Sequence, residues 1–149
     1  MTTTFNLYDQ WRDIVADPTR AAAVAGTLKL AFVTATYTVD QNVHDFFDDI
    51  TNEVTGTGYT AGGNACATPT WTGPDGSGVL TFDAADPATW SQNGAGFTNA
   101  RKAILYYDTG TSSTSRLVGY SNDFGADVGN VAGDVTVTFN ASGIYTSPR

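Results

Sequence analysis

Short runs of threonine, valine and aromatic residues, separated by glycine-rich turns, constrain the fold of this chain more than any other feature. The clearest run covers residues 134–140, where apolar and polar residues alternate and Val135, Val137 and Phe139 share one face. Such side chains suit a pleated surface, and glycine suits the turns between strands. Several runs of this kind predict a mainly β fold, an antiparallel β-sandwich of the jelly-roll type.

The same pattern predicts where the strands lie along the chain. We expect strands over residues 28–39, 64–72, 79–83, 97–107, 116–120 and 134–140. Pro74-Asp75-Gly76 favours a tight turn, so the strands on either side of it should form a hairpin. Pro69 cannot donate a backbone hydrogen bond, which moves the strand around it towards a sheet edge. We also expect the strands before and after residues 108–115 to pair as a hairpin.

Two segments have the spacing of helices instead. Residues 7–16 place apolar side chains at three- and four-residue steps, with a capping residue before them and a proline just after them. Residues 41–50 repeat this spacing, with an acidic face opposite the apolar one. We therefore expect an N-terminal helical arm over residues 1–26 and a β-sandwich domain over residues 27–149.

The net charge of the chain restricts the kinds of molecule that it is expected to bind. Seven lysine and arginine residues stand against fifteen aspartate and glutamate residues, a formal net charge of -8. The basic residues are scattered, so we expect neither nucleic acid nor an anionic membrane surface as a partner. We find no apolar run long enough to span a bilayer and no pattern of a signal peptide.

Groups suited to covalent chemistry are few. The chain has one histidine, His44, and one cysteine, Cys66, and no serine lies in a nucleophile motif. We expect His44 to be a surface or capping residue and Cys66 to act as a small buried apolar side chain. The sequence therefore predicts a protein that is not an enzyme and has no cofactor.

Two acidic clusters and the tryptophans are the remaining candidates for ligand binding. The clusters are Asp45, Asp48, Asp49 and Glu53, and Asp123, Asp127 and Asn130. The first lies on the polar side of a predicted helix and the second lacks the spacing of a calcium-binding loop, so we predict no metal site. Trp11, Trp71 and Trp90 fit positions in a core or an interface better than they fit sugar platforms.

A long pattern of motifs covers residues 28–146, most of the chain. Its most specific part is Asn52-Glu53-Val54 followed by Gly56-Thr57-Gly58-Tyr59-Thr60-Ala61-Gly62-Gly63. Further parts are residues 29–33, 36–40, 82–84, 103–111, 117–120 and 139–144. This pattern resembles the head decoration (cement) proteins of tailed bacteriophages.

The resemblance implies a β-rich virion protein on the outside of the capsid, made in the host cytoplasm. Such a protein forms a homotrimer and stabilises the shell by clamping neighbouring major capsid subunits. No catalytic or cofactor residues come with the resemblance. Two alternatives stay open, a tail, neck or fibre-associated virion protein and a carbohydrate-binding module that uses Trp71 or Trp90.

We expect the binding side chains to be Phe5, Tyr8 and Trp11 of the N-terminal arm. Aromatic anchors dominate many protein interfaces, and an amphipathic arm ahead of a β domain is well placed to contact a neighbour. On this hypothesis, deletion of residues 1–25 leaves a folded domain that no longer attaches. The alternative is that the helix packs against its own sheet.

Overall fold

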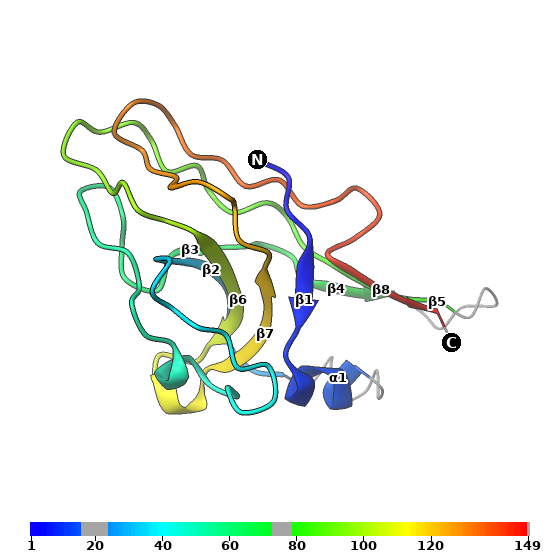
Figure 1. Cartoon of the computed structure of the whole chain (residues 1–149). Helices are drawn as coiled ribbons and strands as arrows, with labels where there is room; N and C mark the ends of the chain where they lie inside the picture. The colour runs from blue at the N-terminus through cyan, green and yellow to red at the C-terminus, as the bar shows by residue number, and fades with distance from the viewer. Residues whose placement is uncertain (16–23, 73–78, 149) are drawn as a thin grey trace.

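Two antiparallel sheets form the framework of the molecule (Figure 1). The computed structural model describes residues 1–15, 24–72 and 79–148. The larger sheet has the strand order β1-β7-β6-β2-β3, and the smaller has the order β4-β5-β8. The strands of the larger sheet are β1 (Phe5–Leu7), β7 (Arg116–Ser121), β6 (Lys102–Asp108), β2 (Thr27–Val33) and β3 (Asn64–Ala65). Those of the smaller sheet are β4 (Thr70–Thr72), β5 (Val79–Asp83) and β8 (Tyr145–Pro148).

Helical structure is limited in the described residues. It consists of α1 (Asp9–Val15) and two short 3-10 helices, η1 (Phe47–Asp49) and η2 (Ser112–Thr114). None of these helices is long or apolar enough to cross a membrane. The prediction of a mainly β fold with antiparallel sheets is confirmed.

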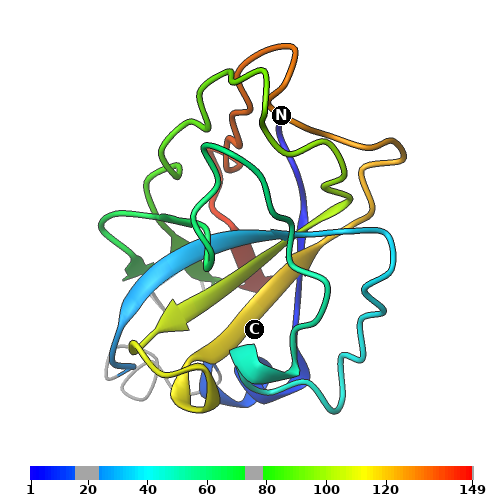
Figure 2. The ribbon, with the colours of Figure 1, turned by 90° about the vertical axis from the view of Figure 1, so that its left-hand side faces the viewer.

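Strand β6 is the centre of the larger sheet, and both of its faces are covered. It pairs antiparallel with β2 on one side and with β7 on the other, so the three strands lie side by side (Figure 2). All residues from Ala103 to Tyr107 are buried. Successive side chains of a strand point to opposite faces, so a strand buried on both sides is apolar throughout. This explains the dense run of apolar residues around Ile104.

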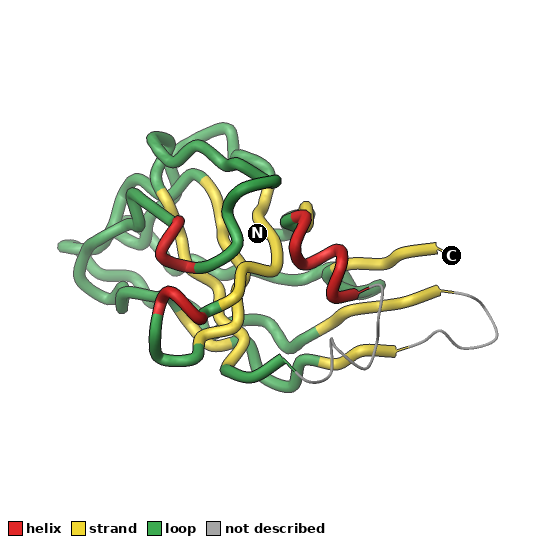
Figure 3. The backbone as a smooth tube through the Cα atoms, turned by 90° about the horizontal axis from the view of Figure 1, so that it is seen from below, coloured by secondary structure: helices red, strands yellow, loops and turns green. Residues whose placement is uncertain are grey.

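Two apolar clusters lie on these two faces. The larger joins alternate residues of β2 and β6 to Phe82 of the smaller sheet. The smaller cluster joins the intervening residues to Tyr37 and Phe47, which come from the segment between β2 and β3. The smaller sheet and α1 lie together at one end of the molecule when it is seen from below (Figure 3).

The expected N-terminal helical arm is absent from the described residues. Phe5–Leu7 forms strand β1, which pairs antiparallel with β7 from Phe5↔Ser121 to Leu7↔Gly119. The helix that follows has seven residues. Phe5 and Leu7 are both buried and alternate with a half-buried Asn6, which is the two-residue period of a strand. Residue 16, the last of the predicted helix, lies outside the described residues.

The expected helix over residues 41–50 is also wrong. This segment is a turn followed by the 3-10 helix η1. The Asp49 carboxylate accepts hydrogen bonds from the backbone N–H groups of Asp45 (2.9 Å) and Phe46 (3.1 Å). The backbone N–H of Phe47 donates to the Ser115 carbonyl, which ties this segment to the start of β7. These bonds give the backbone partners other than those of an α-helix.

The predicted strand over residues 64–72 is divided between the two sheets. Its first part, β3, pairs with β2, and its last part, β4, pairs with β5. Between them Thr68 has a φ of 49°, in the left-handed region that interrupts a strand, and Pro69 follows it. The predicted hairpin pairing of this strand with residues 79–83 is confirmed, whereas the turn over residues 73–78 lies outside the described residues.

The alternating segment over residues 134–140 is buried as predicted but forms no strand of either sheet. Val135, Val137 and Phe139 are buried and the residues between them are exposed. Its backbone makes only isolated bridges, Trp90↔Val135 and Thr2↔Thr138. The strand that does close the chain, β8, was not expected from the sequence.

The remaining expected strands are confirmed: β5 has the predicted bounds and β7 extends one residue further, whereas β2 and β6 are shorter than predicted. The predicted strand over residues 97–107 begins as a strand only at Lys102, and the one over residues 28–39 ends at Val33. Strands β6 and β7 form the predicted hairpin.

Candidate binding surfaces

The three expected anchors, Phe5, Tyr8 and Trp11, lie inside the fold of their own chain. Their exposed fractions are 6%, 0% and 0%. The structure thus has the alternative arrangement, in which the N-terminal segment packs against its own sheets, and these side chains form no exposed surface. The helical spacing identified an apolar face but carried no information about what covers it.

Aromatic contacts hold each of these side chains. The Trp11 ring stacks on Tyr107 with a centroid distance of 5.5 Å. Phe5 meets Phe139 edge to face at 5.8 Å. The Tyr8 hydroxyl lies 3.0 Å from the Tyr37 hydroxyl, and burial raises the pKa of Tyr8 far above its ordinary value. The N-terminal segment is therefore part of the core.

His44 belongs to this same hydrogen-bond network. Its Nδ1 lies 2.8 Å from the Tyr37 hydroxyl and 3.3 Å from the backbone nitrogen of Asp40, which donates to it. Burial raises the pKa of Tyr37 to about 12, so the phenol keeps its proton at neutral pH. His44 thus caps a turn, as the sequence predicted.

The most specific motif block, residues 52–63, is a loop locked by one carboxylate. Glu53 Oε1 accepts hydrogen bonds from the Tyr59 hydroxyl (2.7 Å) and the backbone N–H of Gly62 (2.6 Å). The Tyr59 hydroxyl lies 3.0 Å from the backbone nitrogen of Phe32, which donates to it. Tyr106 donates its hydroxyl to the Gly62 carbonyl at 2.8 Å. The block therefore connects the loop to β2 and β6 of the larger sheet.

Several members of the two acidic clusters make structural contacts. Asp49 and Glu53 bind backbone N–H groups as described above, and the N–H bonds lower the pKa of Asp49. Arg101 forms ion pairs with Asp123 (2.7 Å) and Asp127 (3.6 Å). Asn130, fully buried, accepts from the backbone N–H of Phe97. Within residues 1–15, 24–72 and 79–148, no group of three or more His, Cys, Asp or Glu could hold a metal ion.

The candidate sugar platforms differ in exposure. Trp90 is 1% exposed and packs on Phe32 at 4.6 Å, so neither face of its ring can receive a sugar. Trp71 is half-buried and stacks on Phe82 at 4.3 Å.

Cys66 is buried as predicted, and burial raises the pKa of its thiol to about 12.

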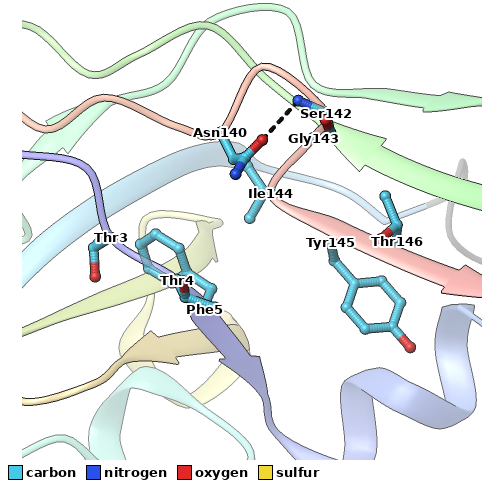
Figure 4. Close-up of a pocket in the computed structure, with 9 residues that line it drawn as sticks. All are labelled: Thr3, Thr4, Phe5, Asn140, Ser142, Gly143, Ile144, Tyr145 and Thr146. Carbon is cyan, nitrogen blue, oxygen red and sulfur yellow. Dashed lines mark hydrogen bonds between the residues drawn. The ribbon is translucent and has the colours of Figure 1, made fainter.

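Three of the open grooves that the described residues form are candidates for ligand binding. One of about 400 Å³ lies between Met1–Thr4 and the segment around Phe124. Another of about 370 Å³ lies beside Lys102 and Tyr120. The third, of about 340 Å³, lies between β1 and β8 (Figure 4). We call this third one the seam groove; its lining residues are Thr3, Thr4, Phe5, Asn140, Ser142, Gly143, Ile144, Tyr145 and Thr146.

A tight turn shapes one end of the seam groove. The Asn140 side chain accepts a hydrogen bond from the backbone N–H of Ser142 (2.9 Å), and its carbonyl accepts one from Gly143 (2.8 Å). Gly143 has a φ of 106°, and a Cβ there would lie 2.6 Å from the Thr81 methyl group. The turn thus holds Ile144 and Tyr145 in a fixed place opposite Phe5.

Comparisons of the chain with protein-family models, with curated proteins and with solved structures gave no match.

Proposed function

We propose that this chain is a structural virion protein that binds the outside of a bacteriophage head and stabilises the shell. In this proposal its two sheets pack as a jelly-roll-like β-sandwich, and the chain assembles as a homotrimer that clamps neighbouring major capsid subunits. It acts by binding and performs no catalysis. Repetition over the shell would convert modest single contacts into strong attachment through avidity.

The observation that carries this proposal is the fixed structure of the motif block, residues 52–63. Residues 52–63 are the most specific part of the resemblance to decoration proteins, and in the structure they are fixed by the Glu53, Tyr59 and Tyr106 contacts. A rigid scaffold loses little entropy when it binds, so more of its contact energy is available for attachment. The rigidity of this loop supports a protein that acts by binding rather than by catalysis.

Imaging of the phage particle tests the proposal directly. We expect cryo-electron microscopy to locate the chain at regular positions over the head, in the copy number of a lattice component. Particles that lack the chain should release their genome at a lower temperature than complete particles. Density at the tail or neck alone would replace the decoration role with the tail-associated alternative, and absence of the chain from the particle would reject both.

A further inference from the structure

We propose that the seam groove binds an extended, uncharged segment of a neighbouring protein chain, which adds as a β-strand between β1 and β8. This inference deepens the proposed function, on which its biological setting rests. It identifies the surface that attaches the chain and the form of its partner.

The groove lies where the N-terminal segment, residues 1–7, and the C-terminal segment, residues 138–148, separate from each other. Thr2 forms a parallel bridge with Thr138, and the backbone N–H of Thr138 donates to the Met1 carbonyl at 2.8 Å. Beyond this bridge the two segments part. Residues 5–7 join the larger sheet and residues 145–148 join the smaller one. The two segments therefore pair with each other at one end of the groove, and along the groove they belong to different sheets.

One wall of the groove is the edge of strand β1, whose outward backbone groups face no partner strand within residues 1–15, 24–72 and 79–148. Strand β1 is the last strand of its sheet in the described residues. The backbone N–H of Tyr8 donates to Val118 of β7, and Asn6 lies opposite Tyr120. Backbone groups alternate in direction along a strand, so those of Phe5 and Leu7 point away from β7. Phe5 lines the groove, and Leu7 continues the same strand edge beyond it.

The opposite wall includes another strand edge. Strand β8 is the last strand of the smaller sheet as far as the structure describes it. In Figure 4, β1 and β8 run in the same general direction on the two sides of the open space. One inserted strand can therefore run antiparallel to both. Edge strands with unpaired backbone groups are the sites at which extended peptides add to sheets.

The chemistry of the lining determines the kind of segment that fits. Among the described residues, no charged side chain lines the groove, although the chain as a whole carries a formal charge of -8. Threonine and serine hydroxyls line its rim, and the buried Phe5 and Ile144 side chains form its apolar part. A charged side chain would lose water here without gaining a partner. The complementary segment is thus uncharged, with an apolar side chain facing Phe5 and Ile144.

A backbone-specific probe tests the groove without any phage component. The probe is a capped peptide of alternating threonine and valine, about six residues long, the usual length of a strand. We expect NMR of the isotope-labelled full chain to show that this peptide slows hydrogen exchange of the Phe5 and Leu7 amides by about tenfold or more. The same peptide with alternate amides N-methylated should have no effect, because it cannot pair. Equal binding of both peptides, protection elsewhere, or no binding at millimolar peptide would overturn the proposal.

Variants that fill the groove provide the matched controls. Thr146→Trp and Ser142→Trp each place a large side chain in the groove at an exposed position, whereas Ser113→Trp adds the same side chain at an exposed position outside it. We expect the two groove variants to weaken peptide binding by at least about tenfold, or roughly 1.4 kcal/mol, and the control to bind normally. Folding of each variant is checked by its amide spectrum. If both groove variants bind like the control, the groove is not the site.

Binding to phage shells that lack the chain separates this inference from the proposed function. Attachment of the unmodified chain and of Ser113→Trp, with loss of attachment in both groove variants, supports both proposals. Attachment of all four proteins supports the virion role and rejects the groove as the contact. Failure of every protein to attach rejects the virion role, and the peptide result then decides the groove alone. Protection of the Phe5 amide that depends only on the concentration of the chain would identify a second copy as the occupant and overturn the proposal.

Discussion

Asp49 is a single residue that determines the local structure around it. Its carboxylate accepts two backbone N–H groups, those of Asp45 and Phe46, and these bonds occur at the start of η1. The bond from Phe46 is the largest cause of the lowered pKa of this carboxyl group. The carboxylate form is therefore bound more favourably in the folded chain than in the unfolded chain.

This pKa shift predicts the acid dependence of stability. Because the folded pKa lies below the ordinary value of 3.8, the contribution of Asp49 is fully present above that value and is lost as the pH falls through the folded pKa. We expect Asp49→Asn to lower the free energy of unfolding at pH 7 by about 1 kcal/mol. The difference from the unmodified chain should shrink as the pH falls below 3.8, because both side chains are then neutral. Urea unfolding at neutral and acidic pH measures it.

Asp48→Asn is the control for this experiment. Asp48 is the neighbouring residue in η1, is exposed, and makes neither of the two backbone bonds. Its replacement should change stability by less than about 0.5 kcal/mol at either pH. Equal losses in the two variants at pH 7 would contradict the role given to Asp49.

At the scale of elements, the entry into β3 depends on a glycine. Gly63 has a φ of 72°, and a Cβ there would lie 1.8 Å from the carbonyl oxygen of Leu30. Leu30 is the residue of β2 that pairs with Asn64 of β3. The close approach of the two backbones is thus what allows β3 to join the larger sheet.

We expect Gly63→Ala to lower the free energy of unfolding by more than about 4 kcal/mol or to prevent folding, since the obstacle is backbone. Gly110→Ala is the matched control. Gly110 has a φ of 86°, and no heavy atom lies within 4 Å of a Cβ placed there. Gly110→Ala should lower the free energy of unfolding by only roughly 1–2 kcal/mol, the cost of placing alanine in the left-handed conformation. Chemical denaturation of the two variants compares the costs, and similar losses would show that strain in φ alone, rather than contact with β2, limits position 63.

The strands that could be predicted from the sequence are those whose pattern is local. Strand β5 and the β6–β7 hairpin follow from β-branched and aromatic runs bounded by turn residues. The segment over residues 134–140 shows the limit of this logic, because alternation predicts which side chains are buried but not whether the backbone has a neighbouring strand to pair with. Strand β8 could not be predicted, since its partner β5 lies over sixty residues earlier.

The candidate site has the same limit. Phe5, Tyr8 and Trp11 were expected to bind a neighbouring protein, and in the structure they are buried within their own chain. The seam groove consists of backbone edges and common residues such as Thr4 and Ser142. No motif marks such a site, and only the divergence of the two sheets creates it.

At the scale of the whole molecule, the N-terminal segment is a component of the core. It supplies strand β1 and five buried apolar side chains, which are Phe5, Leu7, Tyr8, Trp11 and Ile14. The loss of one large core side chain typically costs about 2–5 kcal/mol, and a domain is usually stable by only about 5–15 kcal/mol. The free-energy cost of deleting the segment should therefore exceed the free energy of unfolding of the whole fold.

We expect the chain without residues 1–25 to be unfolded, with collapsed amide dispersion in its NMR spectrum and no cooperative thermal transition. This is the opposite of what a separable arm requires. Arg12→Ala is the control within α1, because the Arg12 side chain is 55% exposed and its ion pair with Asp9 is at the surface, so its loss should change stability by less than about 1 kcal/mol. A truncated chain that unfolds cooperatively would contradict the core role of the segment. If that folded chain also failed to attach to phage shells, the N-terminal segment rather than the body of the β domain would be the element that binds the capsid.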